Sequence, residues 1–118
     1  MGLVEFEEQT DHKVVPGYSQ GTGQVLRAEG FEVTKISFAK GQGADPHSHE
    51  QDQFAYVLKG RLKVTIGDGE DGYEVGAGQA TYNPTGTVHS VEALEDTTVL
   101  SFKAPMNDEE YEATGRLS

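Results

Sequence analysis

The sequence contains no cysteine among its 118 residues. Neither a disulfide framework nor a thiolate metal site is therefore available to it. It also lacks an apolar run that approaches the length of a membrane span, and its first residues, MGLVEFEEQTDHKVV, lack the basic-then-apolar order of a signal peptide. From these absences we expect a cytoplasmic protein.

Positive charge is scarce, with nine Lys and Arg residues against twenty Asp and Glu residues and a net charge of −11. A surface this acidic repels phosphate backbones and anionic lipids, so we expect neither nucleic acid nor a membrane as a partner. The acidic residues are scattered through the chain and do not form a tail, which favours a role in solubility.

Hydrophobic residues are also few, at 35%, whereas glycine is frequent, with 15 residues. This composition favours a single turn-rich all-β domain over a helical bundle. From Val25 onward, short β-like runs alternate with Gly, Pro, Asn and Asp, as in a sandwich or small barrel. The predicted strands are FEVTKISFA, QFAYVLK, RLKVTI, YEV, QATY, TVHSVEA and TTVLSFKA.

We expect three segments along the chain. Residues 1–24 form an N-terminal arm or an added strand, residues 25–104 form the β-barrel, and residues 105–118 form a C-terminal tail. Within the tail, Asn107 or Asp108 is a suitable helix cap and Gly115 a suitable helix end, so a short helix is expected there.

The run QFAYVLK is apolar on both faces. If Gln53 points inward, then Ala55 and Val57 do so too, and Phe54, Tyr56 and Leu58 point outward. An apolar outer face must be covered, either by the N-terminal arm or by a second copy of the chain. We expect a homodimer built on this face.

Three of the four histidines lie in β contexts beside turns. His47 and His49 are two residues apart and so share one strand face, and His89 follows a Pro-Thr-Gly turn. Three neutral imidazoles that meet in a barrel form a suitable site for a divalent ion such as Zn, Fe or Ni. His12 lies in the polar arm and is interpreted as an ordinary surface residue.

The spacing of these residues resembles the two motifs of the cupin family. The first motif reads Gly41, QGADP, His47, Ser48, His49, EQD, Gln53, FAYVLK, Gly60, and the second reads Gly78, QATYN, Pro84, Thr85, Gly86, TV, His89, SVE, Ala93. The resemblance covers about residues 25–104. It implies an all-β cupin jelly-roll barrel that holds one divalent ion (Fe, Zn, Ni or Mn) through His47, His49, Gln53 and His89.

Gln53 stands where the family usually has an acid. An amide oxygen brings no negative charge, so the bound ion keeps its full charge towards a substrate but is held less tightly. In the alternative interpretation, Gln53 only hydrogen-bonds nearby groups and three histidines hold the ion.

The resemblance implies a metal-dependent activity on a small organic molecule, and we expect a dioxygenase-like oxidoreductase. One alternative is a non-redox lyase or isomerase, since similar small cupins act on unsaturated uronates in pectin and alginate breakdown. Those relatives carry an Asp and an Arg where this chain has Leu100 and Met106. The other alternative is a metal-containing module that binds a small ligand without catalysis.

Tyr82 is the candidate for proton transfer, although a tyrosine in a strand more often serves in a core or an interface.

Overall fold

The structure is a computed structural model that describes residues 2–8, 12–13, 19–48, 51–67 and 71–104. The expected helix in the tail lies outside the described residues. The described part of the chain contains one short 3-10 helix and ten strands. These elements are η1 (Phe6–Glu8), β1 (His12–Lys13), β2 (Thr22–Arg27), β3 (Glu32–Phe38), β4 (Gly43–His47), β5 (Gln53–Lys59), β6 (Arg61–Ile66), β7 (Asp71–Gly76), β8 (Ala80–Asn83), β9 (His89–Ala93) and β10 (Thr97–Lys103). No helix in these ranges is long and apolar enough to cross a membrane.

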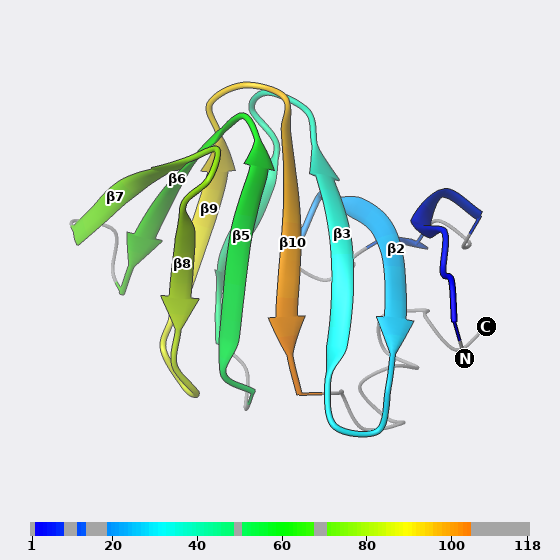
Figure 1. The fold of residues 1–118 in the computed structure, drawn as a ribbon. Coiled ribbons are helices and arrows are strands. Elements are labelled where there is room, and N and C mark those ends of the chain that lie inside the picture. Colours follow the sequence, from blue (N-terminus) through cyan, green and yellow to red (C-terminus); the bar gives the residue numbers. More distant parts are fainter. Residues whose placement is uncertain (1, 9–11, 14–18, 49–50, 68–70, 105–118) are drawn as a thin grey trace.

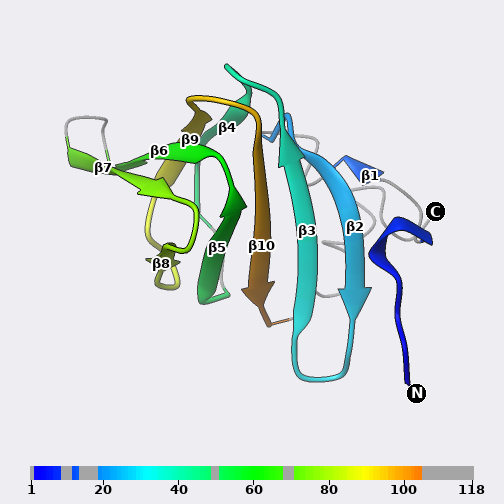
Figure 2. The ribbon, with the colours of Figure 1, turned by 45° about the horizontal axis from the view of Figure 1, so that its top comes forward.

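The strands form two antiparallel sheets that pack face to face. The larger sheet has the order β1-β2-β3-β10-β5-β8, and the smaller has the order β4-β9-β6-β7. Figure 1 shows the larger sheet in front and the smaller sheet behind its β8–β5 side, and Figure 2 shows the same two layers with the top tilted towards the viewer. This arrangement confirms the predicted all-β, double-sheet fold.

Apolar side chains fill the space between the sheets. The core cluster consists of Ile36, Phe38, Ala55, Val57, Leu62, Val64, Val75, Ala93 and Val99. Ala55 and Val57 alternate with the outward residues of β5, because successive side chains in a strand point to opposite faces. The predicted inward and outward faces of β5 are therefore confirmed.

The inner face of the larger sheet changes from apolar to polar along its strands. One cross-strand row is apolar and consists of Ile36, Val99 and Val57. The next row consists of Thr34, Ser101, Ala55 and Thr81. The row beyond it is fully polar and consists of Glu32, Lys103, Gln53 and Asn83. We call this last set the polar row.

The structure adds strands that the sequence patterns did not predict. β2 begins at Thr22 and pairs with both β1 and β3, so regular pairing starts before Val25. β4 was read as a turn because Gly43 and Pro46 lie within it. Proline is tolerated there because β4 is an edge strand of the smaller sheet, where one row of N–H groups makes no ladder bond.

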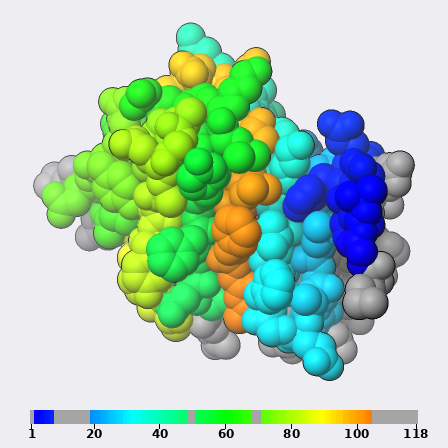
Figure 3. Space-filling view, in the orientation of Figure 1, coloured from blue at the N-terminus to red at the C-terminus, as the bar shows by residue number. Residues whose placement is uncertain are grey.

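The outer face of the larger sheet carries exposed apolar side chains. Phe54 is 54% exposed, Tyr56 38% and Leu58 43%, and Tyr82 and Phe102 on the flanking strands are 47% and 40% exposed. Phe54 is the register partner of both Tyr82 and Phe102, so the aromatic residues are contiguous. Figure 3 shows this face of the sheet turned towards the viewer.

Candidate functional site

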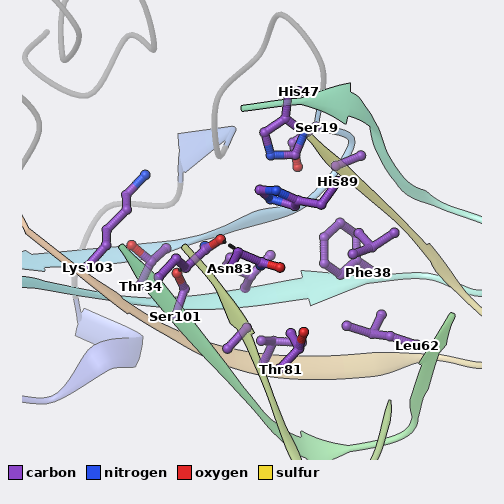
Figure 4. Close-up of a pocket in the computed structure, with 16 residues that line it drawn as sticks. Ser19, Thr34, Phe38, His47, Leu62, Thr81, Asn83, His89, Ser101 and Lys103 are labelled. Atoms are coloured by element: carbon purple, nitrogen blue, oxygen red, sulfur yellow. Dashed lines mark hydrogen bonds between the residues drawn. The ribbon is translucent and has the colours of Figure 1, made fainter. Parts of the chain in front are cut away.

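A cavity of about 70 Å³ lies between the two sheets. Its larger-sheet wall includes Gln53, Asn83, Ser101 and Lys103, and its smaller-sheet side includes His47 and His89. Figure 4 shows the two imidazoles on one side of this cavity and the polar residues of the larger sheet on the other. Phe38, Leu62, Val91 and other apolar side chains close its inner end.

The two imidazoles lie against each other because their strands are paired. His47 ends β4 and His89 begins β9, and the two residues are register partners. Their ring centroids are 4.3 Å apart with an interplanar angle of 61°. His89 is buried, at 2% exposure, whereas His47 is half-buried. The structure thus brings together two of the three histidines that the sequence singled out, and His49 lies outside the described residues.

Backbone carbonyls orient both rings. Nδ1 of His47 lies 2.6 Å from the carbonyl oxygen of Asp45, and Nδ1 of His89 lies 3.0 Å from that of Thr87. A carbonyl oxygen only accepts hydrogen bonds, so each neutral ring carries its proton on Nδ1 and its lone pair on Nε2. Imidazole ligands of metal ions typically have this tautomer and this contact between the other ring nitrogen and a carbonyl oxygen.

Gln53 lies in the cavity wall within a chain of hydrogen bonds. Its Nε2 donates to Oγ of Ser101 at 2.7 Å, and its Oε1 accepts from Nδ2 of Asn83 at 3.2 Å. The amide nitrogen faces Ser101, so the oxygen is the atom of this side chain with the chemistry of a metal ligand. The geometry is compatible with an oxygen ligand and also with the alternative hydrogen-bonding role.

The turn before His89 is held to the start of β5. The amide N of Thr87 donates to the carbonyl of Pro84 at 3.1 Å, and Gly86 has a φ of 78°, which glycine adopts without strain at the third position of a type II turn. Asp52 accepts hydrogen bonds from the amide N of Thr85 at 2.8 Å and from its hydroxyl at 2.9 Å. These bonds lower the pKa of the Asp52 carboxyl, with a smaller contribution from the Tyr82 hydroxyl. Asp52 therefore couples the segment carrying Gln53 to the segment carrying His89.

The expected proton-transfer residue is not in this cavity wall. In β8, Thr81 and Asn83 point inward, so Tyr82 points outward, where it is 47% exposed and stacks on Phe54 with ring centroids 4.7 Å apart. The alternation along β5 that predicted an outward Phe54 does not predict the direction of the Tyr82 side chain. That direction depends on the register between β5 and β8, which the sequence does not reveal.

Sequence reasoning missed several polar residues of the cavity wall, among them Asn83, Ser101 and Lys103. Ser101 and Lys103 follow Val99 at the period of a strand, so the alternation in TTVLSFKA was a usable signal for both. Leu100, which was compared with the acid of uronate-acting cupins, has the outward parity, and Met106 lies outside the described residues. Asn83 gave no signal, because it precedes a proline in a turn-rich stretch.

Lys103 contributes a buried positive charge to the wall. Its Nζ lies 3.8 Å from Oε1 of Glu32, and the two side chains are 5% and 0% exposed. The charges neutralise each other within the protein interior, where an unpaired charge is strongly disfavoured.

The donor set fits a borderline divalent ion. His47, His89 and Gln53 line a common cavity with imidazole and amide side chains, and such N/O sets suit Zn, Fe, Ni and Mn. Within the described residues, no three His, Cys, Asp or Glu side chains come together, so the third imidazole expected from the motif would have to come from His49.

Comparisons with known proteins agree with this architecture. A family model described as "Cupin domain" matches residues 34–102, which is more than half of the chain. Among curated proteins, none matches. KdgF from Halomonas sp. is a similar solved structure, with a TM-score of 0.76 and 26% identity over 92% of this chain and 97% of that chain.

Two further solved structures share the fold at lower identity. An RmlC-like cupin from Shewanella frigidimarina NCIMB 400 has a TM-score of 0.77 and 20% identity, over 92% of this chain and 95% of that chain. Oxalate decarboxylase from Bacillus subtilis, described with Mn(II) centres, has a TM-score of 0.72 and 23% identity over 91% of this chain and 31% of its own.

Proposed function

This chain belongs to the cupin family, and from that premise we propose that it binds one divalent metal ion through His47, His49, His89 and Gln53 and acts on a small organic molecule. The observation that carries the proposal is the pair of Nδ1–carbonyl contacts, which direct the Nε2 lone pairs of His47 and His89 away from the backbone. The Mn(II) centres described for oxalate decarboxylase support a metal in this fold.

Each residue has a defined part in this proposal. His47 and His89 are positioned by β4–β9 pairing, and His49 is included on the sequence motif alone. Gln53, oriented by Ser101, supplies a neutral oxygen. The ion, when bound, would supply Lewis acidity or a redox centre for an oxygen-dependent reaction. The apolar side chains at the inner end of the cavity exclude water from the reacting atoms.

We propose a dioxygenase-like reaction as the first candidate chemistry, because ferrous iron held by three neutral imidazoles would have coordination positions left for a substrate and oxygen. The test is to load the protein with iron anaerobically and then to measure oxygen uptake. Turnover that persists with Zn, Ni or Mn in the absence of oxygen would contradict it.

One observation favours a second candidate, a non-redox lyase or isomerase that acts on an unsaturated sugar acid. Uronate-acting cupins carry an Arg where this chain has Met106. In this chain Lys103, which lines the cavity, supplies a cation instead. A ligand that binds with no turnover under either condition would leave the third candidate, a metal-containing binding module.

Elemental analysis of protein purified without an affinity tag tests the metal site. We expect close to one divalent ion per chain in the wild type, and in His89→Ala an affinity for that ion lower by at least about 100-fold. His12→Ala is the matched control, since neither motif includes His12, and it should retain the metal. Unchanged metal content in His89→Ala would remove His89 from the ligand set.

A further inference from the structure

Asn83 carries a buried acceptor atom with no partner in the described part of the chain. The residue is 2% exposed, and its Oδ1 is buried and makes no hydrogen bond there. A buried carbonyl oxygen without a partner is unusual and costs free energy, so it points to a ligand or an ordered water that completes it.

The hydrogen-bond chain in the polar row explains why this oxygen remains. Asn83 donates to Gln53, and Gln53 donates to Ser101, so both amide nitrogens are used in the same direction. The chain therefore ends on the Asn83 side with an acceptor. Asn83 lines the cavity, and Figure 4 shows it across the cavity from His47 and His89.

The cavity restricts the ligand to a few non-hydrogen atoms. Its volume of about 70 Å³ is less than half of the ~150 Å³ that accommodates benzene in an apolar protein cavity. The group that enters beside Asn83 is therefore small, and any larger part of the ligand stays in the mouth of the cavity.

We propose that Asn83 Oδ1 accepts a hydrogen bond from a hydroxyl group of the ligand, so that the cavity selects a small alcohol or 2-hydroxy acid over the ketone or 2-keto acid of the same size. This inference rests on the proposed function only in placing the ligand in the same cavity. A site built to pair with a hydroxyl discriminates strongly against an analogue that leaves its buried polar group unpaired. Asn83 is thus a specificity-determining residue.

Two matched ligand pairs test the proposal by NMR titration of the metal-free protein. Propan-2-ol with acetone forms an uncharged pair, and lactate with pyruvate forms an anionic pair. The two members of each pair have the same non-hydrogen atoms, and only the alcohol carries a hydroxyl donor at the carbon compared. We expect the hydroxyl member to bind about tenfold more tightly in at least one pair. Equal binding of both members in both pairs, or tighter binding of the ketone, would overturn the proposal.

Variants assign the preference to Asn83. Asn83→Leu keeps the size of the side chain but removes the acceptor, and the affinity ratio should fall to about one. Asn83→Asp loses the same donor to Gln53 but keeps an acceptor, so it should retain the preference in the uncharged pair. Thr34→Val is the control, because it removes another buried polar atom from the same wall. A preference that survives in Asn83→Leu would overturn the assignment. If that variant does not fold, a shift of the Asn83 side-chain amide signals in the wild type with the hydroxyl probe alone supports the assignment, and no shift overturns it.

Metal content separates this inference from the proposed function. At saturating ion concentration Asn83→Leu should still bind one ion per chain, although loss of its hydrogen bond to Gln53 should lower the affinity about tenfold. Failure to bind the ion even at saturation would make Asn83 a metal ligand and overturn the inference while leaving the metal site in place. Absence of metal from the wild type would contradict the proposed function. The ratios of alcohol to ketone affinity would still test this inference, because they are measured on the metal-free protein.

Discussion

The two charged residues of the polar row have the largest desolvation cost among the residues of the interior. Lys103 and Glu32 are almost fully withdrawn from water and 3.8 Å apart. Transfer of charges out of water offsets most of their attraction, so the pair itself adds little stability, but removal of one partner leaves the other charge buried.

Lys103→Met should therefore lower the free energy of unfolding by about 3–5 kcal/mol, measured by urea denaturation. The double variant Glu32→Gln/Lys103→Met should recover most of this loss, because no uncompensated charge remains. Lys59→Met, at an exposed position, should change the free energy of unfolding by no more than about 0.5 kcal/mol. A similar loss in the single and double variants would contradict the charge argument.

Residue patterns alone predicted three residues of the candidate site, His47, Gln53 and His89. Alternation placed Gln53 inward and Phe54 outward, and both placements agree with the structure. Histidine spacing singled out His47 and His89, which lie together in the cavity. The sequence did not predict Asn83 as a site residue. Asn83 lies beside Gln53 only because of the register between β5 and β8, and no local sequence pattern encodes that register.

At the scale of elements, the predicted strands from residue 53 onward agree closely with the structure. β5 and β6 have the predicted bounds, and β7 to β10 differ from them by at most two residues at either end. β4 was missed because its glycine and proline suppress the strand signal. Its conformation is imposed by pairing with β9, and the register shift between Ala44 and His47 accommodates the irregular sequence.

Gly43 controls this pairing. A Cβ added at Gly43 would lie only 2.0 Å from the carbonyl oxygen of Val91 in β9, so a side chain there forces the strands apart. Gly43→Ala should destabilise the protein by about 1–3 kcal/mol and weaken metal binding, because β4 and β9 carry His47 and His89.

Thermal denaturation and metal titration of the same samples measure both effects of Gly43→Ala. Gly30→Ala is the matched control, because a Cβ added there meets no atom within 4 Å. Equal effects of the two substitutions on metal affinity would show that β4–β9 spacing does not set the site.

At the scale of the whole molecule, the exposed outer face of the larger sheet is the dominant feature. We propose that a second copy of the chain covers it, because the aromatic side chains of β5, β8 and β10 form one contiguous apolar surface on a protein that is otherwise strongly acidic. A two-fold arrangement would bury the same residues in both copies.

Light scattering coupled to size exclusion should therefore give a mass twice the 12.8 kDa of one chain. Phe54→Lys should shift the protein towards the monomer, because it places two like charges near the centre of the interface. Val88→Lys is the control, since Val88 is 42% exposed but precedes β9, which belongs to the smaller sheet. A monomeric wild type would contradict the proposed assembly.

The polar row also has a consequence for redesign and for evolution. Glu32, Lys103, Gln53 and Asn83 stand on four successive strands at one level, although they are far apart along the chain. Because all four positions lie within strands, we expect that the ligand preference of the barrel can be changed by exchanging them as a block. Exchanging Glu32 or Lys103 alone breaks their ion pair, and exchanging Gln53 or Asn83 alone breaks their hydrogen bond, so we expect each pair to covary among relatives.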